Sequence, residues 1–344
     1  MPSLQKTLII GPSWVGDMIM AQSLFIKLKQ QNPQGLIDVM APAWSEPMLA
    51  AMPEINESIV MPIGHGEAGL KKRYQLGKAL RTKQYDRAII MPNSFKSALI
   101  PFWAKIPERI GFKGEMRFGL INKMHILDKS VLTMTVQRYV ALAEEPSKRA
   151  PSYPKPALKI DQADQTDTLE ALQLDTEKPI LALCPGAEYG PAKCWPAKYY
   201  ADVANRAIEQ GWDVWILGSE KDQPTAQEIQ TIVNRDNCIS LTGKTSLHQV
   251  MVLLSLASHV ISNDSGLMHV AAAVGTPVIS VYGSSDPSYT PPLSFNSQIA
   301  YLNLECSPCF KRECPLGHLD CLNKLTPDFV WGLLESNLAV AIKE

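Results

Sequence analysis

The chain has 344 residues, a length that favours two domains because single hydrophobic cores stop growing near about 250 to 300 residues. Hydrophobic residues make up 46% of it and charged residues 19%, which excludes a disordered or fibrous protein. Its 33 Lys and Arg residues balance 34 Asp and Glu residues, so the net charge of -1 offers no global field for binding nucleic acid. An anionic ligand must therefore be bound by a local site.

The longest apolar stretches, 250–260 and 98–104, are shorter than the roughly 18 residues that a transmembrane helix needs. The apolar run from Leu8 to Ile10 is too short for a signal peptide and has no small-residue cleavage site. Seven scattered cysteines, an odd number, indicate thiols rather than a disulfide framework. We therefore expect a cytoplasmic protein.

Short apolar runs alternate with amphipathic stretches in the first half of the chain. Buried parallel strands are expected at 7–10, 37–40, 59–61 and 88–91. Helical spacing is found at 17–31, 70–83 and 94–104. This order of elements predicts a βαβ series.

The sequence changes character between 146 and 179, where prolines follow one another closely and a polar stretch comes after them, and a second series then begins. Its strands are expected at 180–184, 214–217, 260–263 and 278–282. Its helices are expected at 196–210, 224–233, 247–257, 267–274 and, last, 327–342.

The two series predict an α/β protein with two Rossmann-like, doubly wound domains. We assign 1–155 to an N-terminal domain, 156–178 to a linker and 179–326 to a C-terminal domain. The segment 327–344 is expected to form a helix that packs back across the domain junction. The carboxyl ends of both sets of strands are expected to face a central cleft, because open α/β sheets bind ligands at that edge.

The first strand is followed by Gly11 and Gly16, whose spacing is not that of a dinucleotide-binding fingerprint. Asp17 stands at the start of the next helix and has two interpretations. It can be a charge that complements the helix dipole, or a general base that takes a proton from an acceptor hydroxyl.

A second strand-to-helix turn comes at 263–269. There Asp264 or Ser265 can cap the helix, and Gly266 allows a ligand to approach the backbone. The unpaired N–H groups at the helix start make an anion site that fits a diphosphate. His269 lies one turn after Ser265, where it can reach a phosphate oxygen or serve as a structural residue.

The long loop 184–196 carries a single cation, Lys193. Its position after the first strand of the second half favours phosphate binding, and the alternative is a solvated surface lysine. Glu220 ends the next strand and can accept hydrogen bonds from a ribose or sugar hydroxyl.

Cys306, Cys309, Cys314 and Cys321 form a dense cluster with His318 between the last two. The opening CxxC spacing suits a structural zinc ion, and the alternative is four reduced thiols that pack a loop.

Another segment, 105–123, is rich in basic residues and broken by Pro and Gly. We interpret it as a solvated basic loop region, or as a contact surface for an anionic lipid-linked acceptor, formed by Lys105, Arg109, Lys113, Arg117 and Lys123.

Together these motifs resemble the bacterial ADP-heptose:lipopolysaccharide heptosyltransferases, and most closely their heptosyltransferase II branch. The resemblance spans both halves of the chain. It rests on GPSWVGD at 11–17, MAPAW at 40–44, PNSFKSA at 92–98, CPGAE at 184–188, GPAK at 190–193 and NDSGLMH at 263–269.

That resemblance implies a GT-B fold whose C-terminal domain binds the donor, and inverting transfer of L-glycero-D-manno-heptose from ADP-heptose to the first heptose of the lipopolysaccharide inner core. It implies Asp17 as the catalytic base, Lys193 as the diphosphate ligand and Glu220 as the nucleoside contact. The implied donor motif consists of Asp264, Ser265, Gly266, Leu267 and His269. The expected acceptor-binding residues are Ser13, Trp14, Asn93, Ser94 and Lys96.

The resemblance also implies a lipid A-linked acceptor, which places a cytoplasmic enzyme on the inner face of the inner membrane. No cofactor is required for the reaction, since Lys193 and a helix N-terminus can balance the charge of the departing ADP. The alternatives are a nucleotide-sugar hydrolase or epimerase of the same fold, and a two-domain ligand-binding protein without catalysis.

Overall fold

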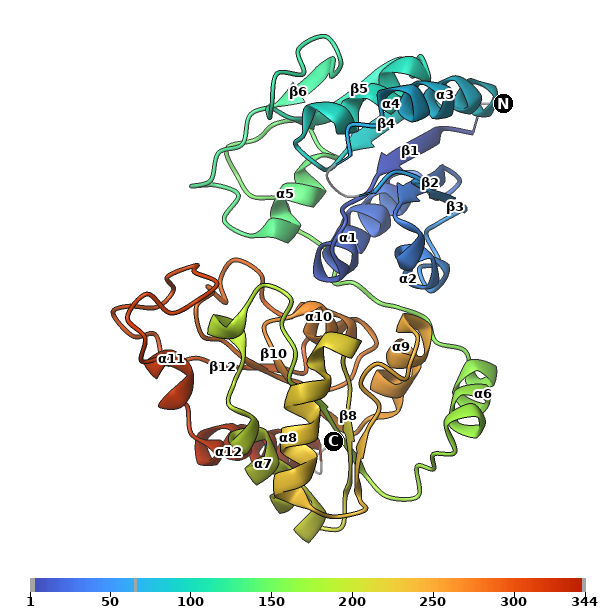
Figure 1. The fold of residues 1–344 in the computed structure, drawn as a ribbon. Helices are drawn as coiled ribbons and strands as arrows, with labels where there is room; N and C mark the ends of the chain where they lie inside the picture. Colours follow the sequence, from blue (N-terminus) through green and yellow to red (C-terminus); the bar gives the residue numbers. More distant parts are fainter. Residues whose placement is uncertain (1–3, 65–66, 342–344) are drawn as a thin grey trace. The chain divides into compact units, whose positions relative to one another are not determined.

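The computed structural model describes residues 4–64 and 67–341, and its chain divides into two compact units, residues 1–158 and 159–344 (Figure 1). The division falls inside the predicted linker 156–178. Most of that linker belongs to the second unit, because it contains helix α6 (Gln162–Leu172), which packs on α9 (Leu247–Leu256). A hydrogen bond from Gln165 to Ser255 joins the two helices.

The first unit contains a parallel sheet with the strand order β3-β2-β1-β4-β5-β6. Its strands are β1 (Lys6–Ile10), β2 (Leu36–Ala41), β3 (Glu57–Val60), β4 (Arg87–Ile90), β5 (Glu108–Phe112) and β6 (Lys123–His125). Its helices are α1 (Val15–Gln31), α2 (Glu46–Ala50), α3 (Leu70–Leu80), α4 (Leu99–Trp103) and α5 (Thr135–Ala141). The four strands predicted from the sequence are present, and β5 and β6 are additions.

Helices cover both faces of this sheet, which is why its central strands are apolar throughout. Successive side chains of a strand point to opposite faces, so Leu8 and Ile10 share one face of β1. There they pack in one cluster with Leu80 at the end of α3 and Ile100 of α4. Helices α1 and α5, which contact each other, lie on the other face.

The second unit repeats this architecture with the strand order β12-β11-β10-β7-β8-β9. Its strands are β7 (Ile180–Cys184), β8 (Asp213–Ile216), β9 (Cys238–Ser240), β10 (His259–Asn263), β11 (Val278–Val281) and β12 (Ser297–Ala300). Besides α6 and α9, its helices are α7 (Ala197–Glu209), α8 (Gln223–Val233), α10 (Gly266–Ala273), α11 (Asp320–Asn323) and α12 (Pro327–Ala341). All four predicted strands are present, and β9 and β12 were not predicted.

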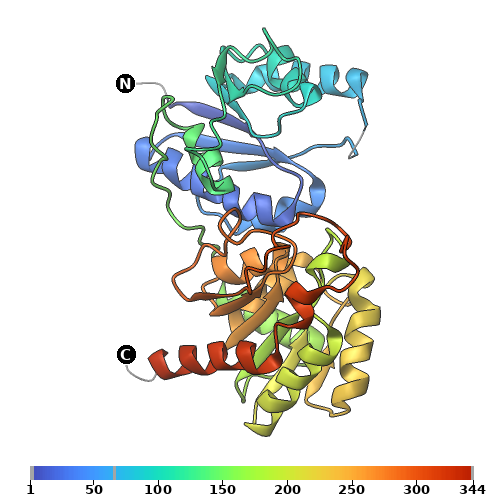
Figure 2. The same cartoon turned by 90° about the vertical axis from the view of Figure 1, so that its left-hand side faces the viewer.

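The core of the second unit lies between its sheet and the helices α7, α8 and α12. Leu183 of β7 and Ile261 of β10 pack in one cluster with Tyr200 of α7, Ile229 of α8 and Trp331 of α12. Helix α12, red in Figure 2, thus packs on α7, β11 and β12 of its own unit. Its packing across the domain junction stays a prediction.

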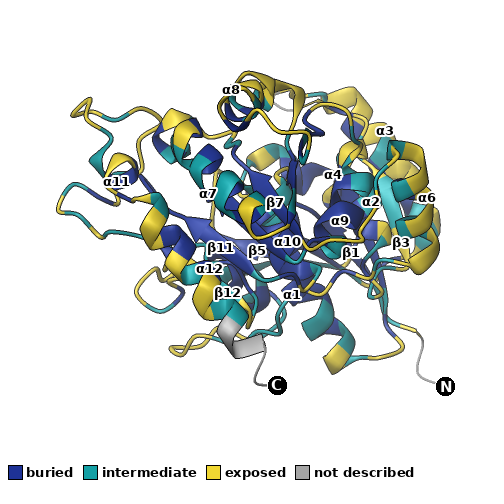
Figure 3. Ribbon diagram, turned by 90° about the horizontal axis from the view of Figure 1, so that it is seen from below, coloured by how far each residue is buried: buried dark blue, intermediate teal, exposed yellow. Residues whose placement is uncertain are grey.

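Both sheets have the same doubly wound order, in which the direction of winding reverses once. The reversal lies between β1 and β4 in the first unit and between β7 and β10 in the second. Ligands of open α/β sheets bind at the carboxyl ends of the strands on either side of such a reversal. The predicted fold class, two Rossmann-like α/β units, is confirmed, and the two reversals locate the functional segments. Figure 3 shows the buried strands inside partly exposed helices.

The prediction of a solvated basic loop region is wrong for Arg117, whereas Arg109 is only partly buried. Arg117 is only 1% exposed, and its guanidinium donates to the carbonyls of Pro92 (2.7 Å) and Phe112 (2.5 Å). Arg109 donates to the carbonyl of Leu120 at 2.6 Å. Both arginines hold backbone carbonyls near β5, and the buried guanidinium of Arg117 requires such acceptors. Burial lowers the pKa of Arg117 from its usual value.

Within the described part of the chain, every helix is too short or too polar to cross a membrane.

Candidate functional site

The turn between β1 and α1 presents the first group of predicted residues. Gly11 donates its N–H to the carbonyl of Met40 at 2.9 Å, which holds the turn close to β2. Ser13 and Trp14 follow and are exposed, and Trp14 occupies the position before the first residue of α1. Asp17 lies in the first helical turn and is half-buried.

The carboxylate of Asp17 has a partner that the sequence did not indicate. The hydroxyl of Tyr139, in α5, donates a hydrogen bond to Oδ1 of Asp17 at 2.8 Å. Burial raises the pKa of Asp17 above its usual value, and the Tyr139 hydrogen bond acts in the opposite direction. A carboxylate with a raised pKa is a better proton acceptor than an exposed one, and the phenol holds it in a fixed orientation.

The segment after β4 carries the other predicted acceptor residues. Asn93 accepts a hydrogen bond from Arg117 through its Oδ1 at 3.0 Å, and the Lys96 ammonium donates to the carbonyl of Glu67 at 3.2 Å. Ser94 accepts a hydrogen bond from Ser97 through its carbonyl at 2.6 Å. Since β1 and β4 are neighbours, this segment and the Asp17 turn lie at the same edge of the first sheet.

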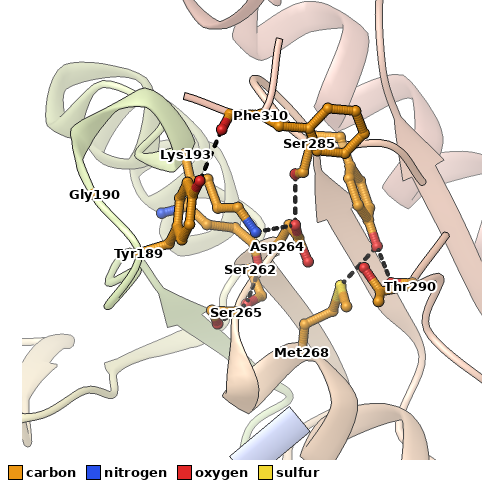
Figure 4. Close-up of polar contacts among 12 residues, drawn as sticks. Tyr189, Gly190, Lys193, Ser262, Asp264, Ser265, Met268, Ser285, Thr290 and Phe310 are labelled. Carbon is orange, nitrogen blue, oxygen red and sulfur yellow. Dashed lines mark hydrogen bonds and ion pairs between the residues drawn. The ribbon is translucent and has the colours of Figure 1, made fainter. Parts of the chain in front are cut away.

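In the second unit, the structure brings Lys193 and Asp264 together (Figure 4). Lys193 ends a short 3₁₀ turn, Pro191–Lys193, and its ammonium lies 2.5 Å from Oδ2 of Asp264. The hydroxyl of Ser285, after β11, donates to the same oxygen at 2.5 Å. The side chain of Lys193 is 17% exposed and that of Asp264 is 5% exposed, so Lys193 is not a solvated surface lysine.

Helix α10 starts beside this ion pair. Ser265 stands at its N-cap but makes no side-chain capping bond, and its hydroxyl lies 3.3 Å from that of Ser262. The expectation that Asp264 or Ser265 caps the helix is therefore wrong, because Asp264 accepts from Lys193 and Ser285 instead. The first N–H groups of a helix have no intrahelical partner, and the helix dipole makes this end positive. Gly266 and Leu267 begin α10 and present these groups.

His269, in α10, is buried, and its Nδ1 has no hydrogen-bond partner within the described residues. Burial lowers its pKa to about 4, an effect that Lys193 strengthens and Asp264 weakens. His269 is therefore neutral at physiological pH, and a neutral imidazole carries one donor and one acceptor nitrogen.

Asn263, at the end of β10, binds the loop 184–196 that carries Lys193. Its Oδ1 accepts hydrogen bonds from the Trp195 backbone N–H (3.0 Å) and from the Tyr200 hydroxyl (2.9 Å). Its Nδ2 donates to the carbonyl of Pro185 at 2.5 Å. These three bonds fix residues 184–196, here called the Lys193 loop, against the end of β10.

Glu220 is exposed in the 3₁₀ turn Glu220–Asp222 that follows β8. The loop after β7 approaches this turn so closely that a Cβ at Gly186 would lie 2.3 Å from Oδ1 of Asp222. A larger residue at position 186 would require the side chain of Asp222 to move. Glu220 thus lies next to the Lys193 loop at the same edge of the second sheet, since β7 and β8 are neighbours.

The four clustered cysteines are free, and Cys321 is the most deeply buried of them. Backbone N–H groups, led by that of Leu319, lower the pKa of the Cys314 thiol, whereas burial raises the pKa of Cys321. In residues 4–64 and 67–341, no three His, Cys, Asp or Glu side chains are grouped so as to hold a metal ion.

The chain therefore carries an acid, Asp17, at the edge of one doubly wound sheet, and a cation, Lys193, beside a helix N-terminus at the edge of the other. Its residues 73–320 match the model of glycosyltransferase family 9 (heptosyltransferase). The protein is a glycosyltransferase, as its motifs predicted.

Its relatives narrow the assignment. The lipopolysaccharide heptosyltransferase 2 of Escherichia coli is 43% identical over 98% of this chain and 99% of its own length. The lipooligosaccharide heptosyltransferase 2 of Haemophilus influenzae is 47% identical over 96% and 99%. The solved structure of the Escherichia coli ADP-heptose heptosyltransferase II has a TM-score of 0.87 at 41% identity and covers 98% of this chain and 99% of its own. The chain belongs to glycosyltransferase family 9, the heptosyltransferases.

The predicted GT-B fold class is confirmed by these neighbours, among which a family 9 glycosyltransferase from Veillonella parvula, only 19% identical, has a TM-score of 0.85. The alternatives of a hydrolase, an epimerase or a non-catalytic binding protein are not favoured.

We predict that Tyr139→Phe moves the acid limb of the kcat/KM profile to higher pH. The Tyr139 hydrogen bond lowers the pKa of Asp17, so its removal raises that pKa. Activity should fall more at acidic than at neutral pH. Tyr153→Phe is the matched control, since the Tyr153 hydroxyl contacts Met134 in the same unit. An unchanged acid limb in Tyr139→Phe would show that the phenol does not tune Asp17.

Proposed function

We propose that this heptosyltransferase transfers L-glycero-D-manno-heptose from ADP-heptose to the first heptose of the lipopolysaccharide inner core, with inversion at the anomeric carbon. The observation that carries the proposal is the placement of Asp17 and Lys193, each at the winding reversal of its sheet. It is supported by 43% identity over nearly the full length to a lipopolysaccharide heptosyltransferase 2.

In the proposed single displacement, Asp17 takes the proton of the acceptor hydroxyl as the oxygen attacks the anomeric carbon of the donor. The bond from that carbon to the diphosphate oxygen breaks, and ADP leaves with its electron pair. Lys193 and the first N–H groups of α10 stabilise the charge that grows on the diphosphate. Because these groups already supply positive charge, we propose no metal in this step.

The remaining donor residues have proposed roles that follow from their positions. Neutral His269 can donate a hydrogen bond to a phosphate oxygen, and the exposed Glu220 can accept hydrogen bonds from the ribose hydroxyls. Asp264 holds Lys193 in place through their ion pair.

The acceptor is proposed to bind at the edge of the first sheet. Trp14 is 55% exposed there and offers an aromatic surface with Ser13 beside it, while Asn93, Ser94 and Lys96 follow the neighbouring strand. An acceptor linked to lipid A is anchored in the membrane. We therefore propose a cytoplasmic enzyme that works at the inner face of the inner membrane.

We propose that Cys306, Cys309, Cys314 and Cys321 stabilise their loop, as thiols or through a structural zinc ion, and take no part in the transfer step. The four sulfur atoms come from one short segment, and the N–H groups around Cys314 favour its thiolate, the form that binds metals.

The function is tested by ADP release from ADP-heptose, measured with and without a lipid A-linked inner-core acceptor. Release should depend on the acceptor, since the acceptor hydroxyl is the nucleophile. Equal release in both reactions would identify a hydrolase instead.

For Asp17→Asn we predict a fall in kcat on the order of 10² or more, because the amide keeps the volume but cannot accept the proton. Donor affinity, measured by calorimetry, should barely change. Asp128→Asn, an exposed aspartate in the same unit, is the control. Near-native turnover of Asp17→Asn would remove Asp17 as the base.

For Lys193→Ala we predict that ADP and ADP-heptose bind more weakly by about 1.5 to 3 kcal/mol, the range for hydrogen bonds to charged groups. Adenosine binding should be spared. Lys198→Ala, on an exposed lysine of the next helix, is the matched control. Equal losses for adenosine and ADP would contradict a phosphate role.

For the cysteine cluster, metal analysis and thermal melting distinguish the two alternatives, a structural zinc ion and free thiols. Bound zinc should copurify near one equivalent, and chelation should then lower the Tm, because a metal that binds only the folded form stabilises it. Free thiols should show no metal and full alkylation on unfolding without reductant. Loss of transfer on chelation at an unchanged Tm would contradict both versions.

A further inference from the structure

The loop that carries three of the four clustered cysteines, residues 305–319 and here called the cysteine-rich loop, is hydrogen-bonded directly to the Lys193 loop. The backbone N–H of Ala192 donates to the carbonyl of Arg312 at 3.0 Å. The hydroxyl of Tyr189 donates to the carbonyl of Phe310 at 2.8 Å (Figure 4). These bonds join two segments that are about 120 residues apart in the sequence.

Further backbone contacts close this arrangement. The N–H of Phe310 donates to the carbonyl of Ser284 at 2.7 Å, and the N–H of Ser284 donates to the carbonyl of Ala192 at 3.2 Å. Gly190 has a φ of +149°, and a Cβ there would lie 2.7 Å from the carbonyl oxygen of Arg312. The backbone of Arg312 is therefore held at a fixed place beside the Lys193 loop.

The side chain of Tyr189 lies near two cations. The Lys193 ammonium is 5.2 Å from the centre of its ring, and the Arg312 guanidinium is 5.4 Å from the same centre. Both distances are in the range of cation–π contacts. One aromatic ring thus keeps Arg312 close to the predicted diphosphate ligand.

The two cations differ in how their charge is balanced. Lys193 is neutralised by the buried Asp264, whereas Arg312 is exposed and makes no salt bridge within the described residues. A diphosphate that enters beside Lys193 also meets the negative charge of Asp264. A second cation would offset the charge of Asp264 toward an anionic ligand, and Arg312 lies beside the Lys193 loop.

We propose that Arg312 is a further donor-binding residue, whose guanidinium binds the diphosphate of a nucleoside diphosphate-sugar together with Lys193. The planar guanidinium matches two phosphate oxygens at once, and the ring of Tyr189 positions it. The proposal rests on the proposed function, in which the donor diphosphate binds at Lys193. It makes the cysteine-rich loop a part of the donor site.

Calorimetry with ADP and adenosine on the full chain tests the proposal. In Arg312→Gln the Kd for ADP should rise on the order of tenfold, the change expected for one lost charged hydrogen bond, and the Kd for adenosine should stay the same. Arg312→Lys should recover part of the ADP affinity. The control is Lys311→Gln, which removes the neighbouring exposed charge and should bind ADP like the unchanged protein.

Thermal melting of each variant confirms that it is folded, and the charge reversal Arg312→Glu should weaken ADP binding further. An ADP affinity of Arg312→Gln within twofold of the unchanged protein would overturn the proposal. An equal loss for ADP and adenosine would also overturn it, since Arg312 would then support the loop alone. If Lys193→Ala binds ADP normally, the proposed diphosphate site itself fails, a result distinct from failure at Arg312.

Discussion

Asp264 follows β10 at the edge of the second sheet with 5% of the residue exposed, and a buried charge is stable only when it is paired and hydrogen-bonded. Lys193 and Ser285 both satisfy one of its oxygens, so loops after three different strands, β7, β10 and β11, meet at a single atom. The arrangement of these three loops depends on this contact. Asn263 extends it by binding the backbone on both sides of the Lys193 loop.

Burial also shifts the pKa of one candidate site residue in each unit. Burial raises the pKa of Asp17, whereas it lowers the pKa of His269 to about 4. His269 therefore stays neutral across the physiological pH range. The group that exchanges a proton in the proposed reaction lies in the first unit, where Asp17 pairs with Tyr139.

The sequence predicted the central strands because they are buried on both faces and read as short apolar runs, as in β1, β7 and β10. Strand β5 was missed because its Glu108 and Arg109 lie among apolar residues, and the edge strands β6 and β9 have only three residues each. Strongly charged segments were interpreted as surface, which fails for Arg117.

The positions of the candidate site residues at strand-to-helix turns were predictable, since Gly and Pro mark such turns locally. Tyr139 was not, because its partner Asp17 lies 122 positions away and nothing near Tyr139 signals the contact. The same holds for Ser285, which follows a strand without a recognisable motif. Residues that act through distant partners are found only when the fold brings them together.

The bonds between the cysteine-rich loop and the Lys193 loop also bear on the order in which the protein is completed during synthesis. A nascent chain that has reached residue 300 contains every strand of the second sheet and the Lys193–Asp264 pair, but not Phe310 or Arg312. It also lacks Trp331 and Leu334, which belong to the core beside α7. The contacts that join the cysteine-rich loop to the Lys193 loop therefore form only after every strand of the second sheet has been synthesised.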